Sequence, residues 1–367
     1  MAHRILVTGG CGFIGRHLVQ ALRERGDVVR ILDLRPWQGK PIDEQVEVTL
    51  GSITDRAAVR QAMTGVDRVF HVAANPNLWA PDPRQFHEVN FVGTCRVLEE
   101  AARRGVDRLI YTSTESILKS VRVPRKSPRS IIDETARLTL DDMPGPYCRS
   151  KFRAEEAAKA AAASGLPVVI VNPTMPLGPG DTLLTPPTKM VLGFVNGKTP
   201  AYLDCEFNLV DARDVARGHV LAAERGRIGE RYILGAENIE LRHLLKELEL
   251  LTGETMPTAR IPYGLAFVAA VVSEAIANLR KKPPIAPVTG VRLARSSMAF
   301  NCSKARMELG WQPRPLRHTL YDALAWMRDE GLLLRQINLP RRSELVPAGL
   351  VAAYKPAPYV ARSLAID

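Results

Sequence analysis

Tyr147 and Lys151 are the residues whose types and spacing most directly indicate chemistry. They lie four positions apart in a segment, 145–163, whose pattern predicts a helix, so their side chains share one helical face. An ammonium group beside a phenol stabilises the phenolate, and we therefore expect Lys151 to lower the pKa of Tyr147. Such a tyrosine can exchange a proton with a hydroxyl group near neutral pH. A surface pair has the same spacing, so the interpretation depends on further residues.

Hydroxyl side chains gather at the end of the predicted strand that precedes this helix. The apolar strand 107–112 ends in Tyr111 and Thr112, and Ser113 and Thr114 follow. Ligands bind at the carboxyl edge of parallel sheets. We therefore expect Thr114 or Ser113 to hydrogen-bond the same substrate oxygen as Tyr147.

The first predicted strand and the first predicted helix are joined by a glycine-rich turn, Thr8-Gly9-Gly10-Cys11-Gly12-Phe13-Ile14-Gly15. Its glycines permit a tight turn and a close approach of a pyrophosphate, to which the helix N-terminus offers N–H donors. The second strand ends at Asp33, whose carboxylate can accept both ribose hydroxyls of an adenosine and repel a 2′-phosphate. This pattern predicts NAD as cofactor in preference to NADP, although the nearby Arg35 could accept a phosphate.

The order of the predicted elements indicates an α/β fold: a Rossmann-type doubly wound parallel sheet with a smaller, partly helical C-terminal substrate lobe. Strands are predicted at 4–8, 28–33, 45–50, 68–73, 107–112 and 166–171, and helices at 13–25, 56–63, 83–104 and 145–163. We divide the chain into an NAD-binding domain (1–174), a substrate-binding lobe (175–331) and a tail outside the compact body (332–367). A strand ending near 234 is expected to return to the sheet.

Composition and charge exclude several classes of protein. The 367 residues are 46% hydrophobic and 24% charged, which is typical of a globular protein and not of a disordered or collagen-like chain. The net charge is +11, but the basic residues are dispersed without an aromatic platform, so we predict no nucleic-acid partner. Five widely spaced cysteines and seven histidines without paired spacing predict no metal site and a reducing compartment, the cytoplasm.

Two further segments bear on the substrate. The apolar stretch 261–279, followed by Arg280, Lys281 and Lys282, is too interrupted to predict a membrane span. It could instead lie in a membrane interface, with 261–282 as a peripheral contact at the inner face of the membrane, or serve as a core or dimer helix; Glu274 interrupts its apolar face. The basic loop 119–129, which begins at Lys119, could attract a carboxylate or phosphate or rest on anionic lipid, although such runs are more often solvated.

Together, these motifs resemble those of the extended short-chain dehydrogenase/reductase superfamily over about residues 4–330. TGGCGFIG is similar to the family's TGxxGxxG, and NFVGT to its NxxGT segment with a structural Asn at position 90. The resemblance implies Thr114, Tyr147 and Lys151 as catalytic residues, a homodimer through helices 83–104 and 145–163, and a small-molecule substrate. Ser52 departs from the pattern, since the family often has an Asp there in contact with adenine.

The resemblance also implies a set of binding residues. The cofactor would contact Gly9, Gly12, Phe13, Ile14, Gly15, Asp33, Leu34, Arg35, Ser52, Ile53, Ala73, Ala74, Asn90, Thr112, Ser113, Tyr147, Lys151, Asn172 and Pro173. The substrate would contact Asn75, Thr114, Asn172 and Arg295.

Two subgroups of the superfamily look most similar. LWAPDP and VNPTMPLGPGD resemble hopanoid-associated proteins that are like sugar epimerases, whereas FNLVDARDVARGHVLAAE and RIPYGLAF resemble 3β-hydroxysteroid and sterol-4-carboxylate dehydrogenases. We therefore expect oxidation or reduction of a secondary alcohol on a polycyclic lipid. The alternatives are a nucleotide-sugar 4-epimerase or dehydratase with tightly bound NAD, and a non-catalytic NAD-sensing scaffold. Phe207 and Asn208 stand where such epimerases usually have an arginine for the diphosphate, which disfavours the sugar.

Overall fold

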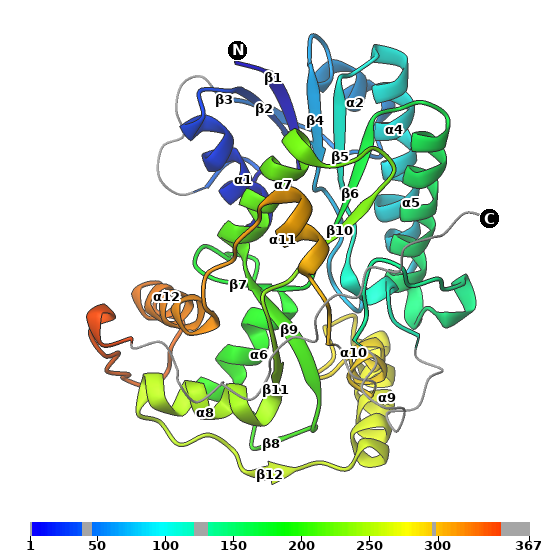
Figure 1. The fold of residues 1–367 in the computed structure, drawn as a ribbon. Helices are drawn as coiled ribbons and strands as arrows, with labels where there is room; N and C mark the ends of the chain where they lie inside the picture. The colour runs from blue at the N-terminus through cyan, green and yellow to red at the C-terminus, as the bar shows by residue number, and fades with distance from the viewer. Residues whose placement is uncertain (1, 39–45, 121–130, 296–298, 346–367) are drawn as a thin grey trace, which may run out of the picture.

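The computed structural model describes residues 2–38, 46–120, 131–295 and 299–345, which form two lobes (Figure 1). The first lobe is built on a seven-stranded sheet in which every strand is parallel to its neighbours. In spatial order the strands are β10 (Arg231–Leu234), β6 (Val168–Pro173), β5 (Arg108–Thr112), β4 (Arg68–His71), β1 (Arg4–Thr8), β2 (Val28–Asp33) and β3 (Val46–Leu50). The α/β Rossmann-type fold that the sequence predicted is confirmed.

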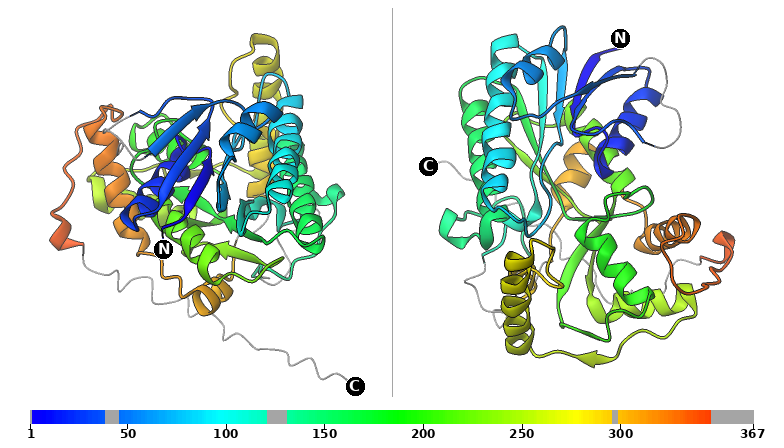
Figure 2. Two further views of the ribbon diagram at one scale, coloured as in Figure 1. Left: turned by 90° about the horizontal axis from the view of Figure 1, so that it is seen from above. Right: turned by 180° about the vertical axis from the view of Figure 1, so that it is seen from behind.

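Helices cover both faces of this sheet (Figures 1 and 2). One face carries α2 (Arg56–Ala62), α4 (Thr94–Arg104) and α5 (Gly145–Ala163), and the other carries α1 (Phe13–Glu24), α7 (Ala212–Arg225) and α11 (Ser303–Leu309). Side chains alternate along each strand, so β1 sends Ile5 and Val7 into one core and Leu6 into the other. Burial on both faces explains the nearly continuous apolar runs of the central strands.

The long helix predicted over 83–104 is interrupted. A short turn, α3 (Arg84–Phe86), leads into a π-helical segment, η1 (His87–Gly93), and regular α-helix begins only with α4. Apolar spacing alone does not reveal this change, because the wider turn is stabilised by side-chain contacts of Asn90 with other elements. Segments of this kind frequently occur at functional sites.

The second lobe contains two small sheets and several helices, shown below the main sheet in Figure 1. One sheet comprises β7 (Met175–Leu177), β9 (Glu206–Asp211) and β11 (Glu237–Glu240), and the other pairs β8 (Ala201–Tyr202) with β12 (Ala259–Arg260). Its helices are α6 (Pro186–Val195), α8 (Leu241–Thr252), α9 (Tyr263–Arg280), α10 (Val288–Ala294) and α12 (Leu316–Asp329). Three 3₁₀ turns complete the described elements: η2 (Glu115–Ile117), η3 (Leu140–Asp142) and η4 (Arg342–Glu344).

The predicted division at residue 174 separates parts that the fold joins. The chain returns from the second lobe to the first through α7, β10 and α11, and β10 pairs with β6. The prediction that the tail lies outside the compact body is wrong for 332–345, because Ile337 and Leu345 are buried. The Asn196 side chain also holds this segment, donating to the Leu332 carbonyl. The rest of the predicted tail, 346–367, lies outside the described residues.

Candidate active site

The turn between β1 and α1 is a cradle that only glycine can form. Gly9 has a φ of +74°, and a Cβ added there would lie 2.7 Å from the Ala73 backbone. A Cβ added to Gly15 would lie 2.0 Å from the Gly9 carbonyl oxygen. Gly12 caps α1 without a side chain, so the first N–H groups of the helix, which have no partner within it, are open to an anion. The cradle therefore fits the pyrophosphate of a dinucleotide.

Asp33 stands at the end of β2 beside this cradle. Its carboxylate accepts hydrogen bonds from the backbone N–H groups of Cys11, at 3.0 Å, and Arg35, at 3.1 Å. The carboxylate is thus fixed next to the glycine turn, as an acceptor for ribose hydroxyls must be. Ser52, by contrast, bonds locally to the Thr54 hydroxyl at 2.7 Å. The next residue, Ile53, is buried against Gly93, whereas Leu34 is largely exposed.

A buried polar network fixes the end of β4 opposite the cradle. The two ring nitrogens of His71 lie 2.7 Å from the Thr8 hydroxyl and 2.9 Å from the Thr94 hydroxyl. The Ala73 N–H donates to Thr8, which places Ala73 against Gly9 of the turn; Ala74 follows it in the chain. Burial lowers the pKa of His71 to about 3, so the ring stays neutral. The sequence shows a histidine within an apolar strand, but the sequence analysis did not predict that its ring would bridge two hydroxyl groups.

Asn90 connects three parts of the site. Its Oδ1 accepts the Asn75 N–H at 2.7 Å, and its Nδ2 donates to the Asn75 carbonyl and to the Ser150 hydroxyl at 3.1 Å. Asn90 therefore ties the π-helical segment to the loop after β4 and to α5, one residue before Lys151. In these bonds Asn75 takes part through its backbone.

Tyr147, Thr114 and Lys151 lie where β5 ends against α5. All three side chains are buried, and the Tyr147 phenol hydrogen-bonds to Thr114. Lys151 Nζ donates to the Thr112 carbonyl at 2.7 Å and lies 4.7 Å from the centre of the Tyr111 ring. The Thr112 hydroxyl turns away, toward His219 at 2.8 Å, and the Ser113 N–H donates to the Val171 carbonyl. The structure thus brings the predicted phenol and threonine hydroxyl into contact.

The predicted direction of the Tyr147 pKa shift is wrong. Burial, reinforced by the nearby Glu115 carboxylate, raises the pKa of Tyr147 above its ordinary value, and the Thr114 hydrogen bond opposes this only partly. Lys151 faces the Thr112 carbonyl, and its own burial lowers its pKa to about 7. Desolvation outweighs the expected charge effect because both groups are enclosed. Tyr147 is therefore a protonated hydroxyl at neutral pH.

Asn172 and Pro173, which the resemblance assigned to cofactor binding, are both buried at the end of β6. The Asn172 amide donates to the Thr114 carbonyl at 3.1 Å and to Glu155 at 2.8 Å. Arg295 is exposed at the end of α10, 5.2 Å from the centre of the Tyr263 ring. Asn208 is buried and bonds to Thr174 and Asn238.

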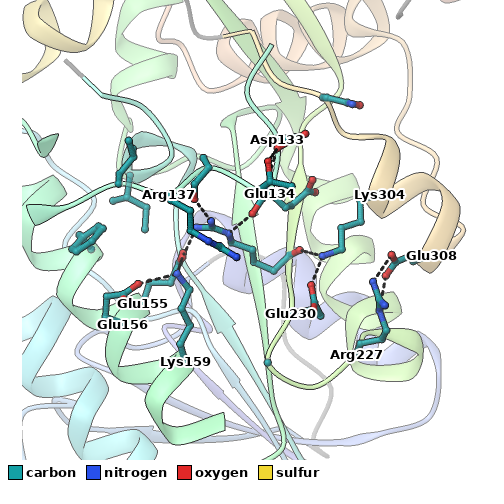
Figure 3. A pocket seen from close by; sticks show the side chains of 18 of the residues that line it. Asp133, Glu134, Arg137, Glu155, Glu156, Lys159, Arg227, Glu230, Lys304 and Glu308 are labelled. Carbon is teal, nitrogen blue, oxygen red and sulfur yellow. Dashed lines mark hydrogen bonds and ion pairs between the residues drawn. The ribbon is translucent and has the colours of Figure 1, made fainter. Parts of the chain in front are cut away.

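A cavity of about 630 Å³ lies beyond Glu155, between α5, β10 and α11 (Figure 3). Tyr147, Thr114 and Lys151 are not among its lining residues. Charged side chains dominate the lining, and they pair with one another, as Arg227 does with Glu308, Lys304 with Glu230, and Arg231 with Glu155. These pairs neutralise the cavity internally, so we assign it no ligand. In the described residues no group of His, Cys, Asp and Glu could hold a metal ion.

The chain belongs to the NAD dependent epimerase/dehydratase family, whose model matches residues 5–235. It is 37% identical to a putative dihydroflavonol 4-reductase of Synechocystis over 92% of this chain and 98% of the relative. It is 32% identical to sterol demethylase protein B of Methylococcus capsulatus over 89% and 99%. The crystal structure of gox2253, 36% identical, superposes with a TM-score of 0.78 over 90% of this chain and 99% of that one. The chain is therefore an NAD-dependent enzyme of the extended short-chain dehydrogenase/reductase type.

Proposed function

We propose that the enzyme interconverts a secondary alcohol and its ketone on a polycyclic lipid, such as a 3β-hydroxysterol or a hopanoid-derived alcohol, with NAD rather than NADP. The observation that carries this proposal is the contact of the Tyr147 phenol with Thr114 after β5, at the same carboxyl edge of the sheet as the glycine cradle after β1, with β4 between them. Two relatives, one named as a reductase and the other as a sterol demethylase protein, favour this class of chemistry.

The proposed reaction moves one hydride and one proton. The nicotinamide, when bound, supplies or accepts the hydride at the carbinol carbon. In reduction Tyr147 gives its hydroxyl proton to the substrate oxygen, Thr114 orients that oxygen, and solvent then reprotonates the phenolate. Lys151 would hold the nicotinamide ribose when the cofactor is bound. The raised pKa of Tyr147 keeps the phenol protonated at neutral pH, as a proton donor in reduction must be. If the substrate carries a 4-carboxylate, the ketone formed by oxidation is a β-keto acid and loses CO₂ without further catalysis.

Incubation with candidate substrates tests the proposal. With cholesterol in detergent and NAD, we expect net accumulation of NADH, and with cholestanone, a 3-ketosterol, we expect net consumption of NADH. UDP-glucose serves as the parallel probe, with products separated by chromatography. Inversion of the sugar without net NADH would identify a nucleotide-sugar epimerase and refute our proposal.

We further propose that α9 rests on an anionic membrane surface at the cytoplasmic face. Leu265, Val268, Val272, Ile276 and Leu279 are between 47% and 85% exposed and follow the spacing of one helical face. Two polar side chains of the helix hydrogen-bond to other parts of the protein. The Glu274 carboxylate accepts the Val288 N–H at 2.8 Å, and Asn278 accepts from Trp79 at 2.9 Å.

The positive charge at the C-terminal end of α9 is suited to an anionic membrane surface. Arg280, Lys281 and Lys282 are exposed, and Arg292 of α10 lies over Phe267. By length and composition the helix could also cross a membrane, with a mean hydropathy of 1.2. Its packing against α10 favours a helix lying along the surface.

Vesicle flotation tests this contact. The enzyme is expected to float with phosphatidylcholine vesicles that contain phosphatidylglycerol, less so without it, and less so at high salt. The double variant Leu265→Glu/Ile276→Glu should bind at least ~10-fold more weakly, because two exposed aliphatic side chains that would enter the membrane interface are lost. Leu250→Glu, an equally exposed leucine (62%) on α8, is the matched control.

Two results would overturn the membrane contact. One is a wild-type enzyme that stays unbound with both kinds of vesicle. The other is a molecular mass by light scattering that halves in the double variant, which would make α9 a contact between copies. We propose that the homodimer forms instead through α4 and α5, so the dimer mass should survive these substitutions.

A further inference from the structure

A buried carboxyl group, which the sequence did not single out, lies beside the proposed catalytic hydroxyls. Glu115 directly follows Thr114 and is 6% exposed. The Thr114 Oγ1 lies 2.8 Å from Glu115 Oε2, and the Ser116 hydroxyl donates to Oε1 at 3.2 Å. The proposed reaction uses the Thr114 hydroxyl, but none of its steps involves Glu115.

The local backbone explains why this carboxyl reaches the hydroxyl. Thr114 is the N-cap of the 3₁₀ turn η2, and its Oγ1 accepts the Ser116 N–H at 3.3 Å. The turn folds the Glu115 side chain back onto the residue before it. Because a threonine hydroxyl has one proton, it can donate to an ionised Glu115 or to a ligand, but not to both. When Glu115 is protonated, the acid donates to Thr114, and the Thr114 proton is free to point elsewhere.

Groups from several elements face Glu115. Tyr147 and Cys148 lie on α5, and Lys119 follows η2; all of them interact electrostatically with the carboxyl. Lys119 is itself 3% exposed, and its Nζ donates to the Leu293 carbonyl of α10 at 2.5 Å. The side chains of Cys205 and Glu206 in turn act to raise the pKa of the Lys119 amine. The alternatives that the sequence offered for the loop 119–129, a solvated run or one that attracts an anion, are both wrong for Lys119, because its side chain is enclosed. The rest of that loop, from 121 on, lies outside the described residues.

Burial acts on both charges of this pair. It raises the pKa of Glu115, while the hydrogen bonds from Thr114 and Ser116 and the charge of Lys119 oppose the rise. Burial lowers the pKa of Lys119 to about 7, against the attraction of Glu115. Both groups can therefore change protonation closer to neutral pH than an exposed glutamate or lysine would.

We propose that Glu115 is a positioning residue whose carboxyl group sets the direction in which the Thr114 hydroxyl donates, with Lys119 as its counter-charge; this rests on the proposed function. Reduction of a ketone needs Thr114 to donate to the carbonyl oxygen, and so needs Glu115 protonated. Glu115 keeps its proton through the cycle, because the proton transferred to the substrate comes from Tyr147. An ionised Glu115 withdraws the Thr114 proton from the substrate.

The pH profile of cholestanone reduction by NADH tests this role. The wild-type enzyme should reduce cholestanone at its full rate below the pKa of Glu115, and this rate should fall as the pH rises through that pKa. Glu115→Gln keeps the shape but cannot ionise, so its kcat should lose this basic fall while KM changes little. Glu115→Asp should retain the fall. Lys119→Met removes the counter-charge and should move the fall to higher pH, because the carboxyl then ionises less easily.

Glu134→Gln is the matched control. Glu134 is also a glutamate whose pKa is raised by burial, to about 7, but it binds the Ile233 N–H in the cavity of Figure 3. This variant should keep the wild-type profile. A Glu115→Gln enzyme that also keeps the wild-type profile would overturn the proposal.

Infrared difference spectroscopy gives a readout without turnover. The carbonyl stretch of a protonated carboxyl, present in wild type and absent in Glu115→Gln, should titrate above pH 4.5, the ordinary value for glutamate. Absence of this band at the pH of greatest activity would refute the role of Glu115. If no ketone is reduced at all, the proposed function fails, while the infrared titration still decides the state of Glu115.

Discussion

Tyr147→Phe is expected to lower turnover by ~10²–10⁴-fold, the usual contribution of a positioned general acid. The substitution removes one oxygen and leaves the ring, which packs edge-on to Phe86 with centroids 6.2 Å apart. The fold should therefore stay unchanged, and NADH affinity should fall far less than kcat, because only the hydroxyl of this cofactor-contacting ring is lost. The measurements are kcat for cholestanone reduction, NADH affinity by fluorescence titration, and circular dichroism.

Tyr232→Phe controls for the loss of a tyrosine hydroxyl. Tyr232 is also a buried ring, and its hydroxyl bonds to Glu308 at the cavity, away from Thr114. Its turnover should stay near wild type. If Tyr147→Phe retained more than a tenth of the wild-type kcat, the phenol would not be the proton donor. Full retention of cellular function in the same variant would favour a non-catalytic, NAD-sensing role.

The second large effect is expected at the glycine cradle. In Gly15→Ala the new Cβ would lie 2.0 Å from the Gly9 carbonyl oxygen and 2.8 Å from Gly10 Cα, both backbone atoms that cannot rotate away. The turn must open, so NADH affinity should fall by more than ~10-fold, and stability should fall by about 1–3 kcal/mol, as overpacking typically costs. Fluorescence titration with NADH and urea unfolding measure the two effects.

Gly264→Ala separates this clash from the general effect of adding a methyl group. Gly264 lies in the first turn of α9, and a Cβ there would meet no atom within 4 Å. We expect unchanged NADH affinity and a stability equal to or above wild type, because alanine favours helix over glycine. Equal NADH affinity of Gly15→Ala and wild type would show that the turn is not the pyrophosphate site.

Some features were predictable because they depend on residues close together in the chain. The alternation of apolar strands and amphipathic helices gave the order of the parallel sheet's elements, and α5 begins and ends where predicted. The cradle is predictable from the spacing of Gly9, Gly12 and Gly15, because the turn itself requires glycine at these positions. The π-helical segment around Asn90 escaped prediction because its stabilising partners, Asn75 and Ser150, lie 15 and 60 residues away.

By itself, the sequence determined the fold class, the family-typical cradle, and the presence of Tyr147, Lys151 and Thr114 near one strand end. Only the tertiary structure decided how these groups behave. It enclosed Tyr147 and Lys151, reversing the expected pKa shift of the phenol, and it set Glu115 against the Thr114 hydroxyl, with the charge of Lys119 acting on that carboxyl. It also turned Glu274 of α9 inward. The reason is physical: turns and periodicity are local, whereas desolvation depends on every element that packs around a group.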